Sequence, residues 1–173
     1  MTDSKDRTKS SKTALETAYS YLANRMRTVR ETEKHLADRG FSPDEIGETI
    51  DELNDLRYLD DYQYALRYYE HNREKRRGSL RAARELAEKG VDQETIRNAR
   101  EDFLFAGKVD EFEDALEAAR RELLLKSSGP VSDDAIPPAD DKAAARIARM
   151  LENRGFARDI IFRVLDRIRR QDD

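Results

Sequence analysis

Apolar residues recur along most of the chain at intervals of three and four, and charged residues fill the positions between them. Ile46, Ile50 and Leu53 form one such set. This is the spacing of one face of an α-helix, and no stretch sustains the period of two that indicates a strand. The pattern predicts helices at 13–26, 28–39, 42–56, 60–76, 79–89, 92–106, 109–126, 139–154 and 157–171. The predicted fold class is therefore all-α.

One six-residue phrase occurs three times: LADRGF at 36–41, LAEKGV at 86–91 and LENRGF at 151–156. The chain has only 7 glycines, so three of them at one place in a repeated phrase indicate a shared structural need. Glycine accepts the left-handed conformation that closes a helix, and apolar residues on either side of the closure then touch. We therefore predict that Gly40, Gly90 and Gly155 each end a helix.

The residues after each phrase are typical of a helix start. Ser42 with Glu45 forms a capping box around Pro43, and Thr28 with Glu31 forms another. Asp60 and Asp92 are suitable caps for two further helices, whereas Ala157 leaves the last helix without one. The repeated unit is therefore a helix end joined to a helix start.

The three glycines are 50 and then 65 residues apart, and the extra length falls in a stretch rich in Pro, Gly, Ser and Asp. We predict three diverged repeats of three helices each, forming an elongated, curved array. The predicted divisions are a disordered tail at 1–13, repeats at 14–57, 58–106 and 107–173, and a loop at 127–141 inserted in the third repeat.

Composition narrows the function. Charged residues make up 40% of the chain and hydrophobic residues 38%, which suits a thin core with a large surface. Cysteine is absent, which excludes disulfides and thiolate metal sites and fits a cytoplasmic location. No apolar run approaches the roughly 20 residues of a membrane helix. The net charge is −4, so any nucleic-acid surface must be a local patch.

The stretch YLDD at 58–61, followed by Tyr64, Ala65 and Arg73, resembles the signature of the RecX family, bacterial regulators of the RecA recombinase. GSLR at 78–81 with the following Glu85 is similar to another segment of that family. The resemblance covers roughly 14–165. It implies triple three-helix repeats and a protein that binds RecA filaments, usually inhibits strand exchange, and catalyses nothing. The signature residues, which we expect to be mostly structural, are Tyr58, Leu59, Asp60, Asp61, Tyr64, Ala65, Gly40, Gly90 and Gly155.

Three positions depart from the family pattern. Arg57 stands where Gly is usual, Ser79 replaces a Pro, and Thr32 replaces a Leu. We expect local changes of turn and packing at these positions, with Ser79 serving as an N-cap.

Enzyme chemistry finds little support. Asp60 and Asp61 form a carboxylate pair, but adjacent helical residues point in different directions, which favours a cap and a first-turn acid. His35 and His71 lie outside any metal-binding spacing. No phosphate-binding loop motif occurs. We expect no catalytic residue, cofactor or metal.

Five tyrosines lie between 58 and 69, and two interpretations apply to them. Stacking on bases is the functional one. Tyr62, Ala65 and Tyr69 nevertheless have the spacing of a buried helix face, which favours core packing. Tyr68 falls off that stripe and is expected to be more open.

Charge is distributed unevenly. Residues 73–84 contain six basic residues and one acid, and residues 142–170 contain nine basic residues and three acids, whereas 44–61 contains eight acids and one arginine. Either these are solvated faces or they contact partners. The candidate surface for RecA or DNA consists of Arg73, Arg76, Arg77, Arg81, Arg84, Arg146, Arg149, Arg163, Arg167 and Arg170.

Together with the resemblance, these features predict a non-enzymatic monomer that binds the RecA filament and single-stranded DNA, directly or within the filament. It would inhibit assembly, ATP hydrolysis and strand exchange, with no membrane partner. A helix-turn-helix-like DNA-binding protein is the alternative, because short glycine turns between helices suit that motif. A helical protein-interaction scaffold is the third possibility.

Overall fold

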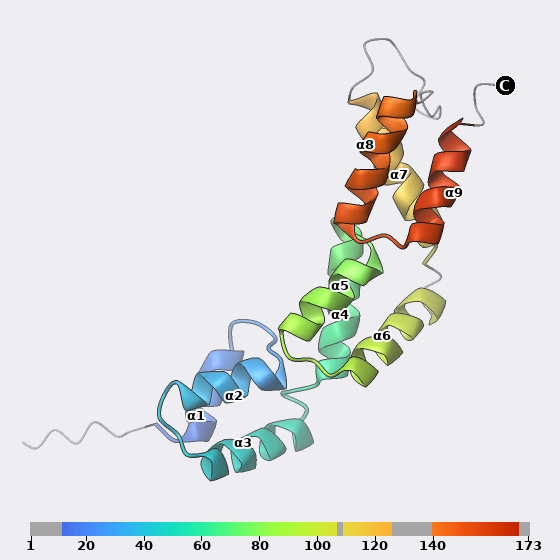
Figure 1. The fold of residues 1–173 in the computed structure, drawn as a ribbon. Coiled ribbons are helices and arrows are strands. Elements are labelled where there is room, and N and C mark those ends of the chain that lie inside the picture. The colour runs from blue at the N-terminus through green and yellow to red at the C-terminus, as the bar shows by residue number, and fades with distance from the viewer. Residues whose placement is uncertain (1–11, 107–108, 126–139, 170–173) are drawn as a thin grey trace, which may run out of the picture. The chain divides into compact units, whose positions relative to one another are not determined.

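The computed structural model describes residues 12–106, 109–125 and 140–169, and within these ranges the regular structure is entirely helical. The predicted all-α class is confirmed (Figure 1). The helices are α1 (Ala14–Leu22), α2 (Val29–Ala37), α3 (Pro43–Asp55), α4 (Asp61–Glu74), α5 (Ser79–Glu88), α6 (Gln93–Ala106), α7 (Glu111–Leu124), α8 (Asp141–Arg154) and α9 (Arg158–Arg169).

The chain forms two compact units. The first contains Met1–Tyr64 with Lys89–Val91, and the second contains Ala65–Glu88 with Asp92–Asp173. The division into repeats at 14–57, 58–106 and 107–173 stays a prediction. Most of the predicted tail and loop, at 1–11 and 127–139, lies outside the described residues.

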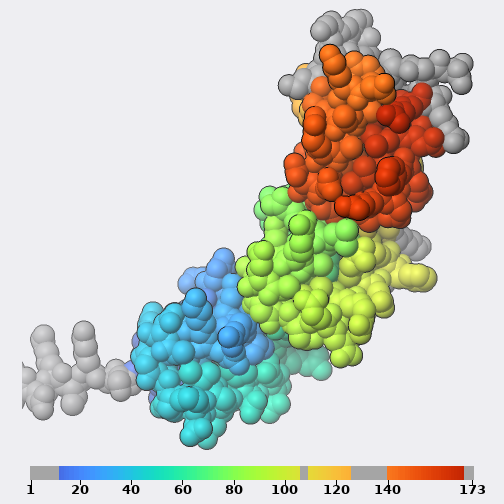
Figure 2. Space-filling model, viewed as in Figure 1, coloured from blue at the N-terminus to red at the C-terminus, as the bar shows by residue number. Residues whose placement is uncertain are grey.

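In the first unit, α1, α2 and α3 pack together around a small apolar core. Figure 2 shows them as one blue-to-cyan mass. Leu36 and Leu53 are fully buried there, beside Leu59 of the YLDD stretch. Thr28 and Thr32 are buried as well, and the Thr32 hydroxyl donates to the Thr28 carbonyl at 2.9 Å. A threonine at position 32 therefore satisfies its own polar group within its helix.

The second unit has two regions of packing. Tyr69 of α4 is 1% exposed, stacks on Phe103 of α6 at 5.4 Å between ring centroids, and donates its hydroxyl to the Ile96 carbonyl. The helices α7, α8 and α9 pack pairwise around a core that includes the fully buried Ile147 and Ile168. Apolar side chains on one face of each helix account for both regions.

The three glycines adopt the predicted left-handed conformation, with φ of 87° at Gly40 and 83° at both Gly90 and Gly155. The closing bond runs from the Phe41 N–H to the Leu36 carbonyl at 3.3 Å. Its counterpart in the third phrase joins the Phe156 N–H to the Leu151 carbonyl at 3.1 Å. Each phrase thus ends its helix as the sequence predicts.

The predicted helix starts are largely confirmed. Both capping boxes form, at Thr28 and at Ser42. Asp60 accepts from the Gln63 N–H and Asp92 accepts from the Thr95 N–H, each at 2.9 Å.

The predicted extent of the first helix is wrong, because α1 ends at Leu22 rather than near residue 26. Thr28 needs an extended backbone to cap α2, with ψ of 161°. Arg27, just before it, turns back so that its guanidinium lies over the Tyr21 ring. Residues 24–27 are therefore needed for the turn between α1 and α2.

Among the described residues, two that are not glycine are left-handed, Arg57 with φ of 57° and Arg76 with φ of 53°. Arg57 closes α3 in the manner of the glycines, since the Tyr58 N–H donates back to the Leu53 carbonyl at 2.8 Å. This is the position where the resembled family usually has Gly. Arginine is strained in this conformation because its Cβ crowds the following carbonyl oxygen.

Candidate functional site: helix joints and the arginine surface

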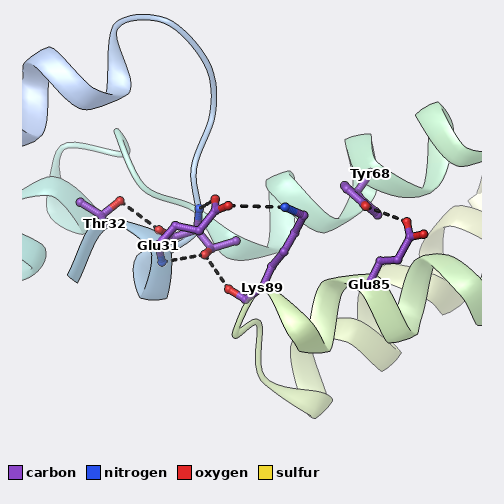
Figure 3. A network of polar contacts seen from close by, with 6 residues as sticks. Glu31, Thr32, Tyr68, Glu85 and Lys89 are labelled. Atoms are coloured by element: carbon purple, nitrogen blue, oxygen red, sulfur yellow. Dashed lines mark hydrogen bonds and ion pairs between the residues drawn. The ribbon is translucent and has the colours of Figure 1, made fainter. Parts of the chain in front are cut away.

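A helix joint is formed where the first turn of one helix meets a glycine-closed helix end and a carboxylate. In the first unit the α2 start meets Lys89, the residue before Gly90 (Figure 3). The Thr28 hydroxyl donates to the Lys89 carbonyl at 2.8 Å, and the Lys89 ammonium lies 3.4 Å from Glu31. The Val29 N–H donates to Asp61 at 2.9 Å. The first N–H groups of a helix have no acceptor within that helix. Asp61 supplies the missing acceptor for α2.

The second unit contains a joint of the same design. The Gly78 N–H donates to the Arg154 carbonyl at 2.8 Å, and the Leu80 N–H donates to the Gly155 carbonyl at 3.2 Å. The Ser79 N–H donates to Glu111 at 2.8 Å. The carbonyls at the end of α8 therefore accept from the start of α5.

Asp61 and Glu111 hold equivalent places, because each is the first residue of its helix and accepts an N–H from another helix. The expectation for Asp60 and Asp61 is met, because Asp60 caps α4 and Asp61 is an acid in its first turn. Asp61 in addition caps α2. The same type of joint therefore occurs twice, and the third repeat stays a prediction.

Ser79 does not cap α5 as predicted. It is itself the first residue of the helix, and its hydroxyl donates to Glu111 at 3.0 Å while accepting from Arg100 at 2.8 Å. The prediction considered only the neighbours of Ser79 in the sequence, and its partners lie 21 and 32 residues away.

Part of the candidate arginine surface is used within the fold. Arg73 contacts Asp114 through two nitrogens, at 2.7 and 3.3 Å. The hydrogen bond to Asp114 raises the pKa of Arg73, so the guanidinium stays charged. Arg146 lies 3.4 Å from Glu122, and the Arg163 guanidinium lies 4.4 Å from the centre of the Phe112 ring.

Two more arginines of the candidate surface contact Glu85. Arg81 donates to it at 2.8 Å, and Arg77 lies 3.9 Å away. The Tyr68 hydroxyl donates to Glu85 at 2.7 Å (Figure 3). Burial would raise the pKa of Glu85, but the hydrogen bonds from Tyr68 and Arg81 lower it below its usual value. Tyr68 is half-buried and thus more exposed than the buried Tyr69, as expected, but its hydroxyl is engaged by Glu85.

The remaining arginines of the candidate surface differ from these. Arg84, Arg149 and Arg167 are exposed, and none has an ionic partner among the described residues. Arg76 is half-buried, and its carbonyl accepts from Arg154 at 3.2 Å. Arg170 lies outside the described residues. Arg84, Arg149 and Arg167 are the members of the surface that the fold leaves available.

The sequence missed the acids that neutralise the other arginines. Asp114 lies 41 residues from Arg73, and Glu122 lies in a different helix from Arg146, so no local pattern linked them. The two signature tyrosines differ in exposure. Tyr58 is 58% exposed and its ring meets that of Tyr19 edge-on, whereas Tyr64 is half-buried. Ala65 is fully buried.

Within the described ranges, no three His, Asp or Glu side chains are grouped so that they could hold a metal ion. None of the helices described there is long and apolar enough to span a bilayer.

Comparisons with known proteins agree with this architecture. The family model for the first three-helix domain of RecX matches residues 14–53, and the model for the second matches residues 60–99. The regulatory protein RecX of Leptothrix cholodnii is 33% identical over 148 residues, which is 86% of this chain and 84% of that protein. The one from Bacillus subtilis is 32% identical over 157 residues, which is 90% of this chain and 55% of that protein.

The crystal structure of RecX from Lactobacillus salivarius superimposes with a TM-score of 0.74 at 24% identity, covering 90% of this chain and 94% of that one. At this identity the likeness concerns the fold. The chain spans about half the length of the first two Bacillus relatives.

Fold and comparisons together define an all-helical regulatory protein that contains three-helix domains. More particularly, the identity and coverage shared with the Leptothrix protein show that the chain belongs to the RecX family. That family consists of regulatory proteins and is not a family of enzymes.

Proposed function

We propose that this protein binds the RecA nucleoprotein filament and inhibits its assembly, its ATP hydrolysis and strand exchange. Membership of the RecX regulatory family is the observation that carries the proposal. The protein would act as a monomer in the cytoplasm, binding RecA and the single-stranded DNA within the filament.

Two oppositely charged surfaces support the proposal. Arg84, Arg149 and Arg167 are exposed without an ionic partner in the described part of the chain, and such side chains suit DNA phosphates or acidic protein surface. On α3, exposed carboxylates likewise lack ionic partners there, and they suit basic protein surface. These carboxylates are Asp44, Glu48, Asp51, Glu52 and Asp55.

The contacts of each arginine indicate whether it stabilises the fold or is available to a partner. Arg73, Arg81 and Arg146 are already paired with acids of the fold, so recruiting them to a partner would leave those acids unpaired. The available arginines can meet a partner without that cost. We therefore place the partner contacts on the available group.

The test is RecA ATPase activity on single-stranded DNA, measured with increasing amounts of this protein up to equal molar ratio. We expect ATP hydrolysis to fall, and electron microscopy to show shorter filaments. The protein alone should hydrolyse no ATP. Unchanged hydrolysis together with unchanged filament length would contradict the proposal, and binding to DNA without any effect on RecA would favour the DNA-binding alternative.

A further inference from the structure

A basic hollow of roughly 190 Å³ lies in the first unit, beside the end of α1, the following turn and α2. The residues that matter for its chemistry are Lys12, Tyr21, Asn24, Arg27, His35 and Arg39. None of them belongs to the arginine surface that the sequence predicts. They escaped notice because they come from three separate stretches and form no run of like charge.

Aromatic contacts hold the hollow in shape. The rings of Tyr21 and His35 are stacked, with centroids 3.8 Å apart and planes 5° from parallel. The Arg27 guanidinium lies 4.1 Å from the centre of the Tyr21 ring. This cation–π contact fixes a long, flexible side chain in one position. A charge that is fixed before a ligand arrives loses less entropy when the ligand binds.

Arg27 is incompletely satisfied in this position. Its Nε is buried and has no hydrogen-bond acceptor in the described part of the chain. A buried donor without an acceptor is unfavourable, and a donor on a charged group especially so. An incoming oxygen anion could supply the missing acceptor.

The charge of the hollow is one-sided. Lys12, Arg27 and Arg39 are permanent cations, and no carboxylate is among the lining residues. The pKa of His35 is lowered, first by burial and then by the charges of Arg39 and Arg27, with Asp38 acting in the opposite direction. The imidazole therefore reports a positive local potential. Guanidinium groups and an amide side chain are the donors that match phosphate oxygens.

We propose that this basic hollow binds a phosphate group of single-stranded DNA. The site is too polar for an apolar ligand, and its lining offers positive charge without a carboxylate. The DNA as ligand rests on the proposed function, in which the protein meets the DNA strand of a RecA filament. Binding to bare DNA can nevertheless be measured without RecA.

The first test compares variants that remove one charge each. Arg27→Gln and Arg39→Gln change the hollow, and Arg97→Gln is the matched control because Arg97 is exposed on α6 and has no ionic partner in the described ranges. Fluorescence anisotropy with a labelled oligothymidylate would be recorded at several salt concentrations. We expect each hollow variant to bind roughly ten- to a hundredfold more weakly, because a charged hydrogen bond is lost. The salt slope should fall by about 0.7 per lost phosphate contact.

A second measurement distinguishes contact from a change in folding. The chain has only 2 histidines, so NMR can follow the His35 ring, with His71 as an internal reference. A phosphate beside Lys12, Tyr21, Arg27, Arg39 and Asp38 should raise the pKa of His35. The ring signals of His71, which lies 3.5 Å from Glu74 outside the hollow, should not respond to DNA. In Arg27→Gln the DNA-dependent rise should be smaller.

The outcomes are decisive in either direction. Equal affinity and slope in Arg27→Gln, Arg39→Gln and Arg97→Gln, or an unchanged His35 signal, would overturn the proposal. If inorganic phosphate shifts the His35 signal but oligothymidylate does not, the hollow holds a small anion and the DNA assignment is wrong. RecA ATPase measured on the same variants reports separately on the proposed function, which can fail while the hollow still binds bare DNA.

Discussion

At the scale of the residue, the three glycines share a backbone conformation but differ in their surroundings. At Gly90 a Cβ would collide with the Arg30 side chain, and at Gly155 it would collide with Arg81. At Gly40 a Cβ would meet nothing within 4 Å. A residue with a side chain would therefore strain the backbone at all three positions. It would also clash with a neighbour at Gly90 and Gly155, where the helix end belongs to a joint.

This difference yields a prediction about valine substitutions. Gly90→Val and Gly40→Val should both be destabilised by roughly 1–2 kcal/mol from the left-handed conformation. Gly90→Val should lose about 1 kcal/mol more, because Arg30 has to move. Thermal melting by circular dichroism measures both. Equal losses would mean that Arg30 moves aside without cost.

Arg57 offers the opposite experiment, since a non-glycine residue there adopts φ of 57°. Arg57→Gly should relieve about 1–2 kcal/mol of strain and lose about 0.4–1 kcal/mol through the freer unfolded chain. We expect a net gain of roughly 0.5–1 kcal/mol in the free energy of unfolding. Urea denaturation would show it, and a lower midpoint would contradict the strain.

Sequence reasoning was most successful where the interaction is local. The capping boxes at Thr28 and Ser42 and the closure at Gly40 join residues three to five positions apart, so their pattern is visible in the chain itself. The role of Ser79 and the partner of Tyr68 were not predicted, because Glu111 and Glu85 lie 32 and 17 residues away from them. The conformation of each turn was predictable, and the partner of each polar group was not.

At the scale of the element, the joints explain how short helices are held at their ends. α5 has only 10 residues, and isolated helices of that length are marginal in water. Its first N–H groups donate to Glu111 and to the carbonyls that end α8. Tertiary partners therefore replace the local cap that this helix lacks.

Removing the carboxylate of the second joint tests this account. Glu111→Ala leaves the Ser79 N–H without its acceptor and Arg100 without its acid, which lies 3.6 Å away. We expect a loss of about 1–3 kcal/mol, the cost of an unsatisfied buried donor. Glu113→Ala is the control, because Glu113 lies on the same helix and is exposed without a partner in the described ranges. Equal stability of the two variants in urea would refute the role given to Glu111.

At the scale of the whole molecule, the sequence predicted where charged residues are concentrated but not which of them are paired. The sequence located the arginines but could not separate those that hold the fold from those that remain available. Arg73 and Arg84 illustrate the difference: the first is paired with Asp114, and the second has no ionic partner in the described part of the chain. The hollow around Arg27 was missed because it depends on how α1 and α2 are packed.

Charge reversal at these two arginines should give opposite results. Arg73→Glu faces Asp114 with a like charge and should lower stability by roughly 1 kcal/mol. Arg84→Glu should keep the melting temperature while weakening binding to single-stranded DNA and reducing its salt slope by about 0.7. Circular dichroism and fluorescence anisotropy on both variants give the comparison. Parental DNA affinity in Arg84→Glu would mean that Arg84 is a solvated residue without a partner.

The joints use main-chain acceptors, namely the carbonyl oxygens of Lys89, Arg154 and Gly155. This affects how far the sequence can diverge. Every amino acid supplies a main-chain oxygen, so substitutions at most nearby positions leave these bonds intact. Only a glycine, a small first-turn residue and one acid are tightly constrained. A protein assembled in this way can exchange most of its surface over evolutionary time while its helices keep the same neighbours, which suits a chain that is about one-third identical to the Bacillus and Leptothrix proteins.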